Sequence, residues 1–477
     1  MKIIIVGGGL CGLYLAYLLK NINIDFEIHE KSSRPGGRIK TINAFGKQLE
    51  CGSHIIQPYH FNMIGLLNKL KLNSSIIDGT KLFTIVDEIN QKIFDNLLNK
   101  IKTSYETDKP VNIPAIVYFT SILSSIELNI FKAHIFIEQD LNTEISDYMK
   151  YAFYDLKLHN QTNCPTFGTK TATETVTKTI TVTGTGTETD KIYHHLNCSK
   201  NKYIVVNTGM QSITDKLANL VQEKLYLNSP VTEITHMPIT NSYIIRAGDR
   251  LINADYLILA TDASIKTIRL SIPKEIKQSI YSVHSNPIMR LYTKHHGNIN
   301  FKTSSIKQMI QTQSVLTNIE KIDSNILGAL YVSGPKTDLL YELLTRPING
   351  QNNLQNNLQN QTYTSKQIKQ LLHTLLQNIT GQQLPPITEY VACKWKQGSH
   401  YNTKKIKTNF WHKHNLILAG EWVHPYHNTL EGSAMSAIET FKIITQNLFE
   451  DKLRHNPDNV KSIEENRTKY IPYDVVI

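Results

Sequence analysis

The first thirty residues have the clearest hydrophobic pattern in the chain. An apolar run at 2–6 (KIIIV) is typical of a buried strand, and a glycine-rich turn separates it from a segment with helical spacing. A second strand is predicted at 25–30 (DFEIHE). This order of strand, helix and strand predicts the start of an α/β domain. The apolar residues at helical spacing after the turn are Leu13, Ala16, Tyr17 and Leu19.

Later stretches repeat this alternation of strands and helices. Residues 203–234 combine a strand, an amphipathic helix and a turn with the letters NSPV, and residues 252–264 predict another strand. Residues 416–441 predict a buried strand followed by a helix rich in small residues. Low-complexity insertions interrupt the pattern at 166–190, where every odd residue from 169 to 189 is threonine, and at 350–362. The threonine segment predicts either an exposed hairpin or a simple-sequence loop.

The glycine turn has the chemistry of a phosphate cradle. Gly7, Gly9 and Gly12 form G-x-G-x-x-G, which suits a tight turn, a close approach of backbone to a pyrophosphate, and close packing of helix on strand. The phosphate would lie at the positive end of the helix. Glu30 ends the second strand, where a carboxylate can accept the hydroxyls of an adenosine ribose. These features predict a dinucleotide site.

A second glycine pair directly follows Glu30. Residues 34–41 (RPGGRIKT) form R-x-G-G-R-x-x-T, in which Arg38 offers a guanidinium suited to phosphate or to a flavin edge. With this motif the sequence resembles the flavin-containing amine oxidase family, which includes monoamine, polyamine and L-amino-acid oxidases. The resemblance is strongest at 1–60, 203–262 and 416–441, and it implies that the dinucleotide is FAD.

The resemblance also implies which residues hold FAD. Gly52 and Ser53 would lie near the flavin ring, and the backbone of Val231 would pair with the adenine. Glu421, at the tip of the last strand, would bind the ribityl–phosphate part. The helix that starts at Leu430 would point its N–H groups at the N1/C2=O edge of the flavin. The full expected set is Gly7, Gly9, Leu10, Cys11, Gly12, Glu30, Lys31, Gly37, Arg38, Gly52, Ser53, Val231, Gly420, Glu421, Leu430 and Gly432.

The substrate side departs from the family pattern. Where many members carry a lysine that holds a water beside flavin N5, either Met289 or Arg290 falls in register, and an arginine does not give up a proton. The resemblance implies two aromatic rings around the substrate. Trp395 and Tyr401 match the first element, but Thr429 stands where the second ring is expected. The expected catalytic residues are therefore Arg290, Trp395, Tyr401 and Thr429.

His400 falls where some family members tether the flavin through a cysteine, so a histidyl link is one open alternative. The histidine pairs at 194–195 and 295–296 do not have metal-ligand spacing with acidic partners, and we expect no metal.

Composition changes this picture little. The 477 residues carry 51 Lys and Arg against 40 Asp and Glu, but the basic residues are dispersed, so we expect no nucleic-acid partner. Five cysteines with no C-x-x-C pair argue against a disulfide framework and favour a reducing, cytoplasmic location. The apolar N-terminus is interrupted by glycines, which disfavours a signal peptide, and no stretch is long enough to span a membrane.

We expect an α/β protein with two domains. Residues 1–75, 201–265 and 386–448 would form a Rossmann-type, glutathione-reductase-like FAD domain. Residues 76–200 and 266–385 would form a mixed-sheet α+β substrate domain, and 449–477 a surface tail.

The expected function is an amine oxidase-type reaction with a small amine and O2 as partners. Two alternatives are oxidation of an isoprenoid- or porphyrinogen-like molecule and a non-catalytic, structural flavoprotein. Neither the substrate nor the oligomeric state is predicted.

Overall fold

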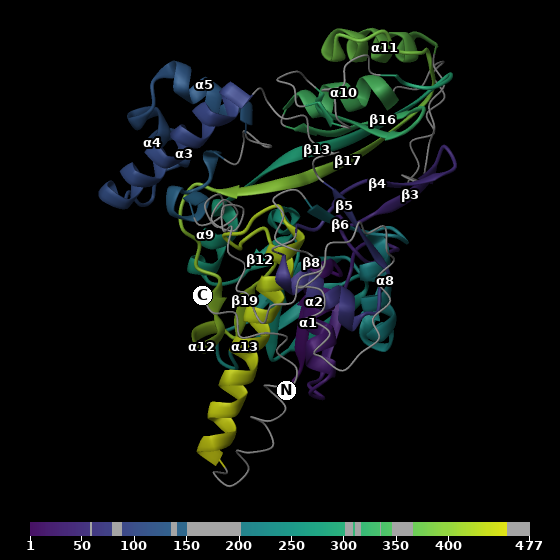
Figure 1. Ribbon diagram of the computed structural model, residues 1–477. Coiled ribbons are helices and arrows are strands. Elements are labelled where there is room, and N and C mark those ends of the chain that lie inside the picture. Colours follow the sequence, from purple (N-terminus) through teal and green to yellow (C-terminus); the bar gives the residue numbers. More distant parts are fainter. Residues whose placement is uncertain are drawn as a thin grey trace, which may run out of the picture.

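The protein has two domains built on β-sheets, one above the other in Figure 1, with a separate group of helices beside the upper domain. The computed structural model describes residues 1–57, 60–78, 88–134, 141–149, 202–300, 309–310, 316–333, 335–345 and 366–455. Both low-complexity insertions lie outside these residues, so the hairpin and loop hypotheses for the threonine segment stay predictions.

A six-stranded sheet forms the centre of the first domain, in the order β18-β19-β11-β1-β2-β7. Its strands are parallel except for the edge strand β18. β1 and β2 come from the N-terminus, whereas β11 and β19 come from the two later stretches that the hydrophobic pattern singled out. The strands are β18 (Asn409–Phe410), β19 (Leu416–Leu418), β11 (Tyr256–Leu259), β1 (Ile3–Val6), β2 (Phe26–His29) and β7 (Leu225–Tyr226).

Each face of this sheet is covered by a different layer. Ile3 and Ile5 of β1 point to the helical layer, and Ile4 and Val6 point to a four-stranded sheet of the same domain. The uninterrupted apolar run of β1 is therefore explained by burial on both faces. The helices are α1 (Leu10–Lys20), α2 (Phe61–Lys69), α8 (Gln211–Leu220) and α13 (Leu430–His455). The four-stranded sheet contains β10 (Arg250–Ala254), β9 (Ser242–Ala247), β8 (Val231–Met237) and β12 (Arg269–Ser271).

The second domain is built on a five-stranded sheet in the order β14-β15-β16-β13-β17, which is called the second sheet below. We expected a mixed sheet, but each pairing of this sheet in the described residues is antiparallel. Two helices, α10 (Pro335–Thr345) and α11 (Lys366–Thr380), cover its outer face (Figure 1). The strands are β14 (Met309–Ile310), β15 (Thr317–Asp323), β16 (Ile326–Ser333), β13 (Val283–His295) and β17 (Ile387–Asn402).

Three expected boundaries were wrong. β12 pairs with β8, so the first domain continues past residue 265. β17 pairs along most of its length with β13, so residues 387–402 belong to the second sheet and not to the FAD domain. α13 runs on to His455, beyond the expected end at 448.

Two antiparallel strand pairs, a group of three helices and two further helices complete the description of the fold. β3 (Thr41–Ala44) pairs with β4 (Lys47–Glu50), and β5 (Ser74–Asp78) pairs with β6 (Lys202–Val206). The helices α3 (Glu88–Asp108), α4 (Ala115–Ile122) and α5 (Ser125–His134) enclose a small apolar core of their own. Two further helices are α9 (Lys274–Ser282) and α12 (Trp411–His414).

Candidate cofactor and active site

The glycines of the turn between β1 and α1 let neighbouring backbone segments come close together. Gly7 has a φ of +111°, and a Cβ there would lie 2.3 Å from the carbonyl oxygen of Ala260. A Cβ on Gly12 would lie 2.1 Å from the carbonyl oxygen of Gly7, so the helix packs directly on the turn. A Cβ on Gly9 would meet nothing within 4 Å. Two glycines therefore serve packing, and Gly9 faces open space at the start of α1.

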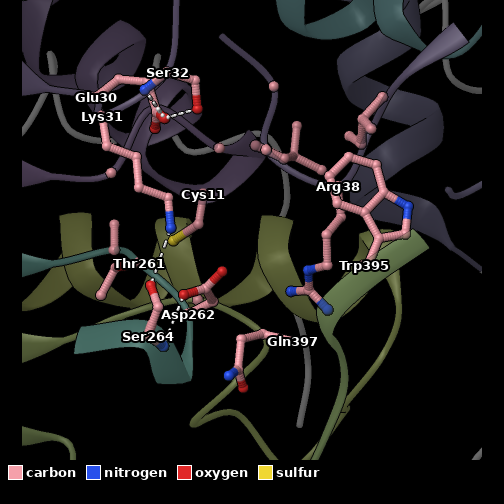
Figure 2. A pocket seen from close by; sticks show the side chains of 18 of the residues that line it. Cys11, Glu30, Lys31, Ser32, Arg38, Thr261, Asp262, Ser264, Trp395 and Gln397 are labelled. Carbon is pink, nitrogen blue, oxygen red and sulfur yellow. Dashed lines mark hydrogen bonds between the residues drawn. The ribbon is translucent and has the colours of Figure 1, made fainter. Parts of the chain in front are cut away.

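Glu30 lies at the end of β2 with its carboxylate held in place. One oxygen accepts the Gly8 N–H at 2.8 Å, and the other accepts the N–H and hydroxyl of Ser32 at 2.8 and 2.6 Å. Only 6% of the residue is exposed. Next to it, Lys31 reaches across to the hydroxyl of Ser264 at 3.1 Å (Figure 2).

A cavity of about 790 Å³ runs from this turn to the second sheet. It is lined by every expected cofactor residue except Gly12 and Gly432, and by the expected Trp395 and Thr429. Gly432, like Gly12, serves packing: a Cβ there would lie 1.9 Å from the carbonyl oxygen of Tyr426. The expected Arg290 and Tyr401 do not line the cavity.

Several lining residues were not selected from the sequence, among them Ser32, Asp262, Lys396, Gln397 and Asn428. For Asp262 a signal existed: it lies near the end of 252–264, the stretch predicted as a strand, and parallel strands end at the same edge of a sheet. Figure 2 shows its carboxylate between Lys31 and Arg38. Burial alone would raise the pKa of Asp262, but the charge of Lys31, the Ser264 hydrogen bond and the charges of Arg38 and His400 lower it.

Glu421 anchors Arg38 at the middle of the cavity. Its buried carboxylate binds the guanidinium of Arg38, accepts from His400 Nδ1 at 2.7 Å and accepts the Asn428 N–H at 2.8 Å. Burial would raise the pKa of Glu421, but the positive charges of Arg38 and His400 and their hydrogen bonds outweigh burial and hold the pKa well below its usual value. We expected this carboxylate to bind the cofactor. It lines the cavity while holding Arg38, His400 and Asn428, and its contact with the cofactor stays a prediction.

Thr429 caps the helix α13. Its hydroxyl accepts the Gly432 N–H at 2.9 Å, which satisfies one of the free donors at the start of the helix. Leu430 and Ser433 in the first turn line the cavity. The positive end of the helix dipole therefore faces the cavity. Thr429, which stands where the second aromatic ring was expected, caps this helix.

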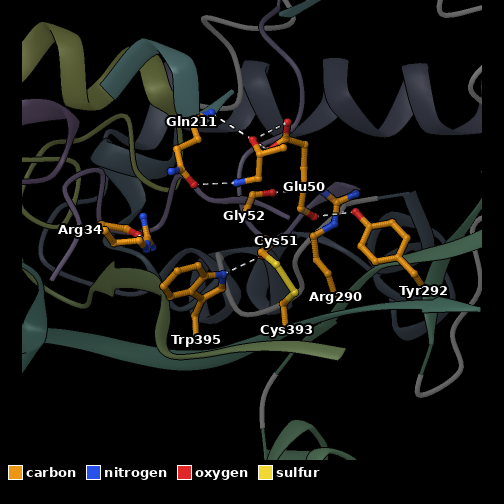
Figure 3. The surroundings of a disulfide bond; sticks show 11 residues. Arg34, Glu50, Cys51, Gly52, Gln211, Arg290, Tyr292, Cys393 and Trp395 are labelled. Carbon is orange, nitrogen blue, oxygen red and sulfur yellow. Dashed lines mark hydrogen bonds between the residues drawn. A yellow bond between two sulfur atoms is a disulfide. The ribbon is translucent and has the colours of Figure 1, made fainter. Parts of the chain in front are cut away.

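The inner face of the second sheet is fastened to segment 50–52. Tyr292 donates its hydroxyl to the Glu50 carbonyl at 2.6 Å, Trp395 its indole N–H to the Cys51 carbonyl at 2.7 Å, and Arg290 its guanidinium to the Gly52 carbonyl at 3.0 Å. A disulfide joins Cys51 to Cys393 of β17 (Figure 3). The cysteine count led us to expect no disulfide, and that expectation was wrong, because spacing along the chain carries no information on a pair 342 residues apart.

Arg290, and not Met289, faces the cofactor side of this sheet. Neighbouring residues of a strand point to opposite faces. Met289 is fully buried in the apolar core beneath α10 and α11. Arg290 is 1% exposed and reaches Gly52, which lines the cavity. Burial raises the pKa of the nearby Glu320 to about 7, and the charge of Arg290 works against that rise.

His400 and Tyr401 occupy opposite faces of β17. His400 is fully buried, and its two ring nitrogens meet Glu421 at 2.7 Å and the N–H of Ala263 at 3.5 Å, which leaves neither for a covalent link to flavin. Tyr401 stacks on His284 with ring centroids 5.2 Å apart. The expectation that Tyr401 is a substrate ring at the cavity was wrong, because the strand alternation turns it away.

Tyr401→Ala is therefore expected to leave the cofactor site unchanged. Flavin content and the rate of anaerobic flavin reduction should stay within about twofold of the parent, while stability falls by about 1 kcal/mol through loss of the stacked ring. Thermal unfolding and the absorbance ratio of flavin to protein measure both. Trp395→Phe is the matched comparison, because it keeps a ring but removes the donor to Cys51 and should lower flavin retention. A large loss of flavin in Tyr401→Ala alone would contradict this placement.

The fold and the cavity define a Rossmann-type FAD protein. Glu30 suits the adenosine ribose, the glycine turn and Arg38 suit the diphosphate, and the start of α13 suits the flavin. All four line one cavity. The sequence model of the flavin containing amine oxidoreductases matches residues 10–298, more than half of the chain. The chain therefore belongs to this family and is an FAD-dependent oxidoreductase.

Relatives of known sequence or structure are distant. The Lysine-specific histone demethylase 1B homolog of Caenorhabditis elegans is 27% identical over 150 residues, which cover 28% of this chain and 18% of that protein. A putrescine oxidase bound to putrescine has a TM-score of 0.62 at 14% identity, covering 93% of this chain and 99% of its own. Cyclohexylamine oxidase from Brevibacterium oxydans has a TM-score of 0.62 at 14% identity, covering 94% and 99%. At this identity the structures show a shared fold.

Another similar structure is a candidate protoporphyrinogen oxidase from an Exiguobacterium species, with a TM-score of 0.60 at 14% identity, covering 93% of this chain and 98% of its own. In the part of the chain that the structure describes, no helix is long and apolar enough to cross a membrane.

Proposed function

We propose that the protein oxidises a small amine. FAD, when bound, would supply the redox chemistry: a hydride would pass to the flavin from the carbon beside the amine nitrogen, and O2 would take the electron pair as hydrogen peroxide. The single observation that carries the proposal is the match to the amine oxidoreductase family over residues 10–298. It is supported by structural relatives that are named for amines, putrescine and cyclohexylamine.

The chain's own groups have electrostatic and positioning roles in this proposal. The start of α13 places backbone N–H groups and the positive end of a helix dipole at the cavity, where they stabilise negative charge. Arg38 is fixed by Glu421 and faces the same space. Arg290 fastens the second sheet to Gly52 and stays protonated, so it does not serve as a proton donor.

A second candidate is oxidation of an apolar, non-amine substrate. One observation favours it: of the positions expected to supply an aromatic pair, Tyr401 faces away from the cavity and Thr429 is a helix cap. A similar fold is found in the candidate protoporphyrinogen oxidase.

A visible spectrum recorded under anaerobic conditions tests both candidates. We expect purified protein to show a flavin spectrum that bleaches when pooled amines, polyamines and amino acids are added, and that recovers with formation of hydrogen peroxide when air is admitted. A spectrum that stays yellow with every amine but bleaches with an apolar substrate would reject the amine proposal in favour of the second candidate. Protein without flavin would contradict both.

For partners and location we propose a soluble small molecule and O2 in the cytoplasm. The cysteine pattern of the sequence supports this location, whereas the Cys51–Cys393 disulfide is typical of an oxidising compartment.

A further inference from the structure

The disulfide lies at the wall of the cofactor cavity. Cys51 is 1% exposed and lines the cavity together with its neighbours Gly52 and Ser53. Its partner Cys393 lies in the middle of β17, and the two Cα atoms are 5.4 Å apart, a usual separation for a disulfide. A two-electron redox group is thus placed beside the site of another two-electron redox group.

The two cysteines differ in access. Cys393 is partly exposed and does not line the cavity, so its exposed surface is reached from another side. Cys51 lines the cavity and is buried. Cys393 is therefore the more accessible residue of the pair, and Cys51 is the one at the cofactor cavity.

Opening the disulfide would leave the two cysteines close together. Segment 50–52 is also fastened to the second sheet by Tyr292, Trp395 and Arg290, through one hydrogen bond to each of three consecutive carbonyls (Figure 3). These bonds do not depend on the sulfur atoms. Two thiols held in this way close again readily, because their encounter is intramolecular.

The third described cysteine is not suited to this exchange. Cys11 lines the cavity as a free thiol, but burial raises its pKa to about 12, with a smaller opposing effect from a hydrogen bond to Ser436. A thiol that stays protonated is a poor nucleophile. Cys11 therefore takes no part in the exchange.

We propose that Cys51–Cys393 is a second redox centre that carries electron pairs between external thiols and the flavin. An external thiolate attacks the sulfur of Cys393, and the thiolate of Cys51 leaves; a second external thiolate then releases Cys393 and departs as a disulfide. The two protein thiols close again to the disulfide and give two electrons and two protons to FAD, which becomes FADH2. O2 removes the electron pair as hydrogen peroxide.

This proposal rests on FAD binding and is independent of the amine substrate. It also removes the conflict between a disulfide and a reducing compartment, because a pair that cycles does not need an oxidising environment to form.

An anaerobic reductive titration of the purified flavoprotein tests the proposal. With dithionite, the wild-type protein should take up about four electrons per flavin, two for the flavin and two for the disulfide, whereas Cys393→Ser should take up about two. Alkylation and peptide mass analysis at each step should find residues 51 and 393 joined in the oxidised protein and both alkylated after reduction.

Dithiothreitol supplies a second, direct measurement. Without air it should bleach the flavin of the wild type, and at least tenfold more slowly that of Cys393→Ser. Wild-type protein that takes up about two electrons while residues 51 and 393 stay joined would overturn the proposal. Finding both cysteines already alkylated in the oxidised protein would do the same. These wild-type measurements decide the question even if a serine variant fails to fold, and no amine is used in either.

Discussion

Gly12→Ala is expected to destabilise the protein before any cofactor binds and to leave it without flavin. The added Cβ would lie 2.1 Å from the carbonyl oxygen of Gly7 and 3.3 Å from a methyl of Ile5. The first is a backbone atom and the second belongs to a fully buried side chain, so neither can yield cheaply. Overpacking of this kind costs about 1–3 kcal/mol or more. The shift of α1 that relieves the clash would also move the N–H groups that face the phosphate.

Gly9→Ala is the matched variant, because its Cβ would meet no protein atom within 4 Å. We expect the unfolding temperature of its apoprotein to equal that of the parent, while FAD affinity falls at least tenfold since the methyl group enters the cofactor's space. Apoprotein melting and flavin titration separate the two effects. Equal melting temperatures for apoprotein Gly12→Ala and the parent would show that the close contact with Gly7 is not needed for the fold.

This contrast explains which part of the site the sequence could predict. The turn at Gly7–Gly12 and the acid at Glu30 belong to one local βαβ unit, where spacing along the chain fixes spacing in the fold. The site residues on strand β17 were harder to predict, because neighbouring side chains of a strand point to opposite faces of the sheet. His400 and Tyr401 are neighbours in sequence, but one contacts Glu421 and the other stacks on exposed His284, and a resemblance in register does not say which face is buried.

Contacts between distant segments were beyond the sequence for a different reason. The three donors to segment 50–52 come from β13 and β17, more than 230 residues further along the chain. The resemblance singled out Arg290 and Trp395 but not these contacts, because only the docking of the second sheet brings them and Tyr292 to segment 50–52. The same holds for Cys51 and Cys393, and for the change of domain assigned to 387–402.

Glu421→Gln is expected to cause the largest combined loss of stability and flavin. Removing the charge leaves the guanidinium of Arg38 without its counter-ion and weakens the hydrogen bond between the carboxyl group and Nδ1 of the buried His400. Breaking a buried pair on one side costs about 3–5 kcal/mol, and we expect the lower end because Arg38 is 26% exposed. Flavin content should also fall, since Arg38 is no longer fixed towards the cavity. Chemical unfolding at pH 7 and flavin absorbance measure the two losses.

The pH dependence identifies the carboxylate as the source. The pKa of Glu421 is lower in the folded protein than its ordinary 4.5, so its ionisation stabilises the fold above that value and the stabilisation is lost as the pH falls through the folded pKa. The stability difference between the parent and Glu421→Gln should therefore be constant near neutral pH and shrink below about pH 4.5. Glu439→Gln, at a carboxylate that is 52% exposed, should stay within about 0.5 kcal/mol of the parent at every pH. A Glu421→Gln deficit of the same size at pH 3.5 and pH 7 would mean that the amide fails through its shape, and that the Arg38–Glu421–His400 charges do not hold the site together.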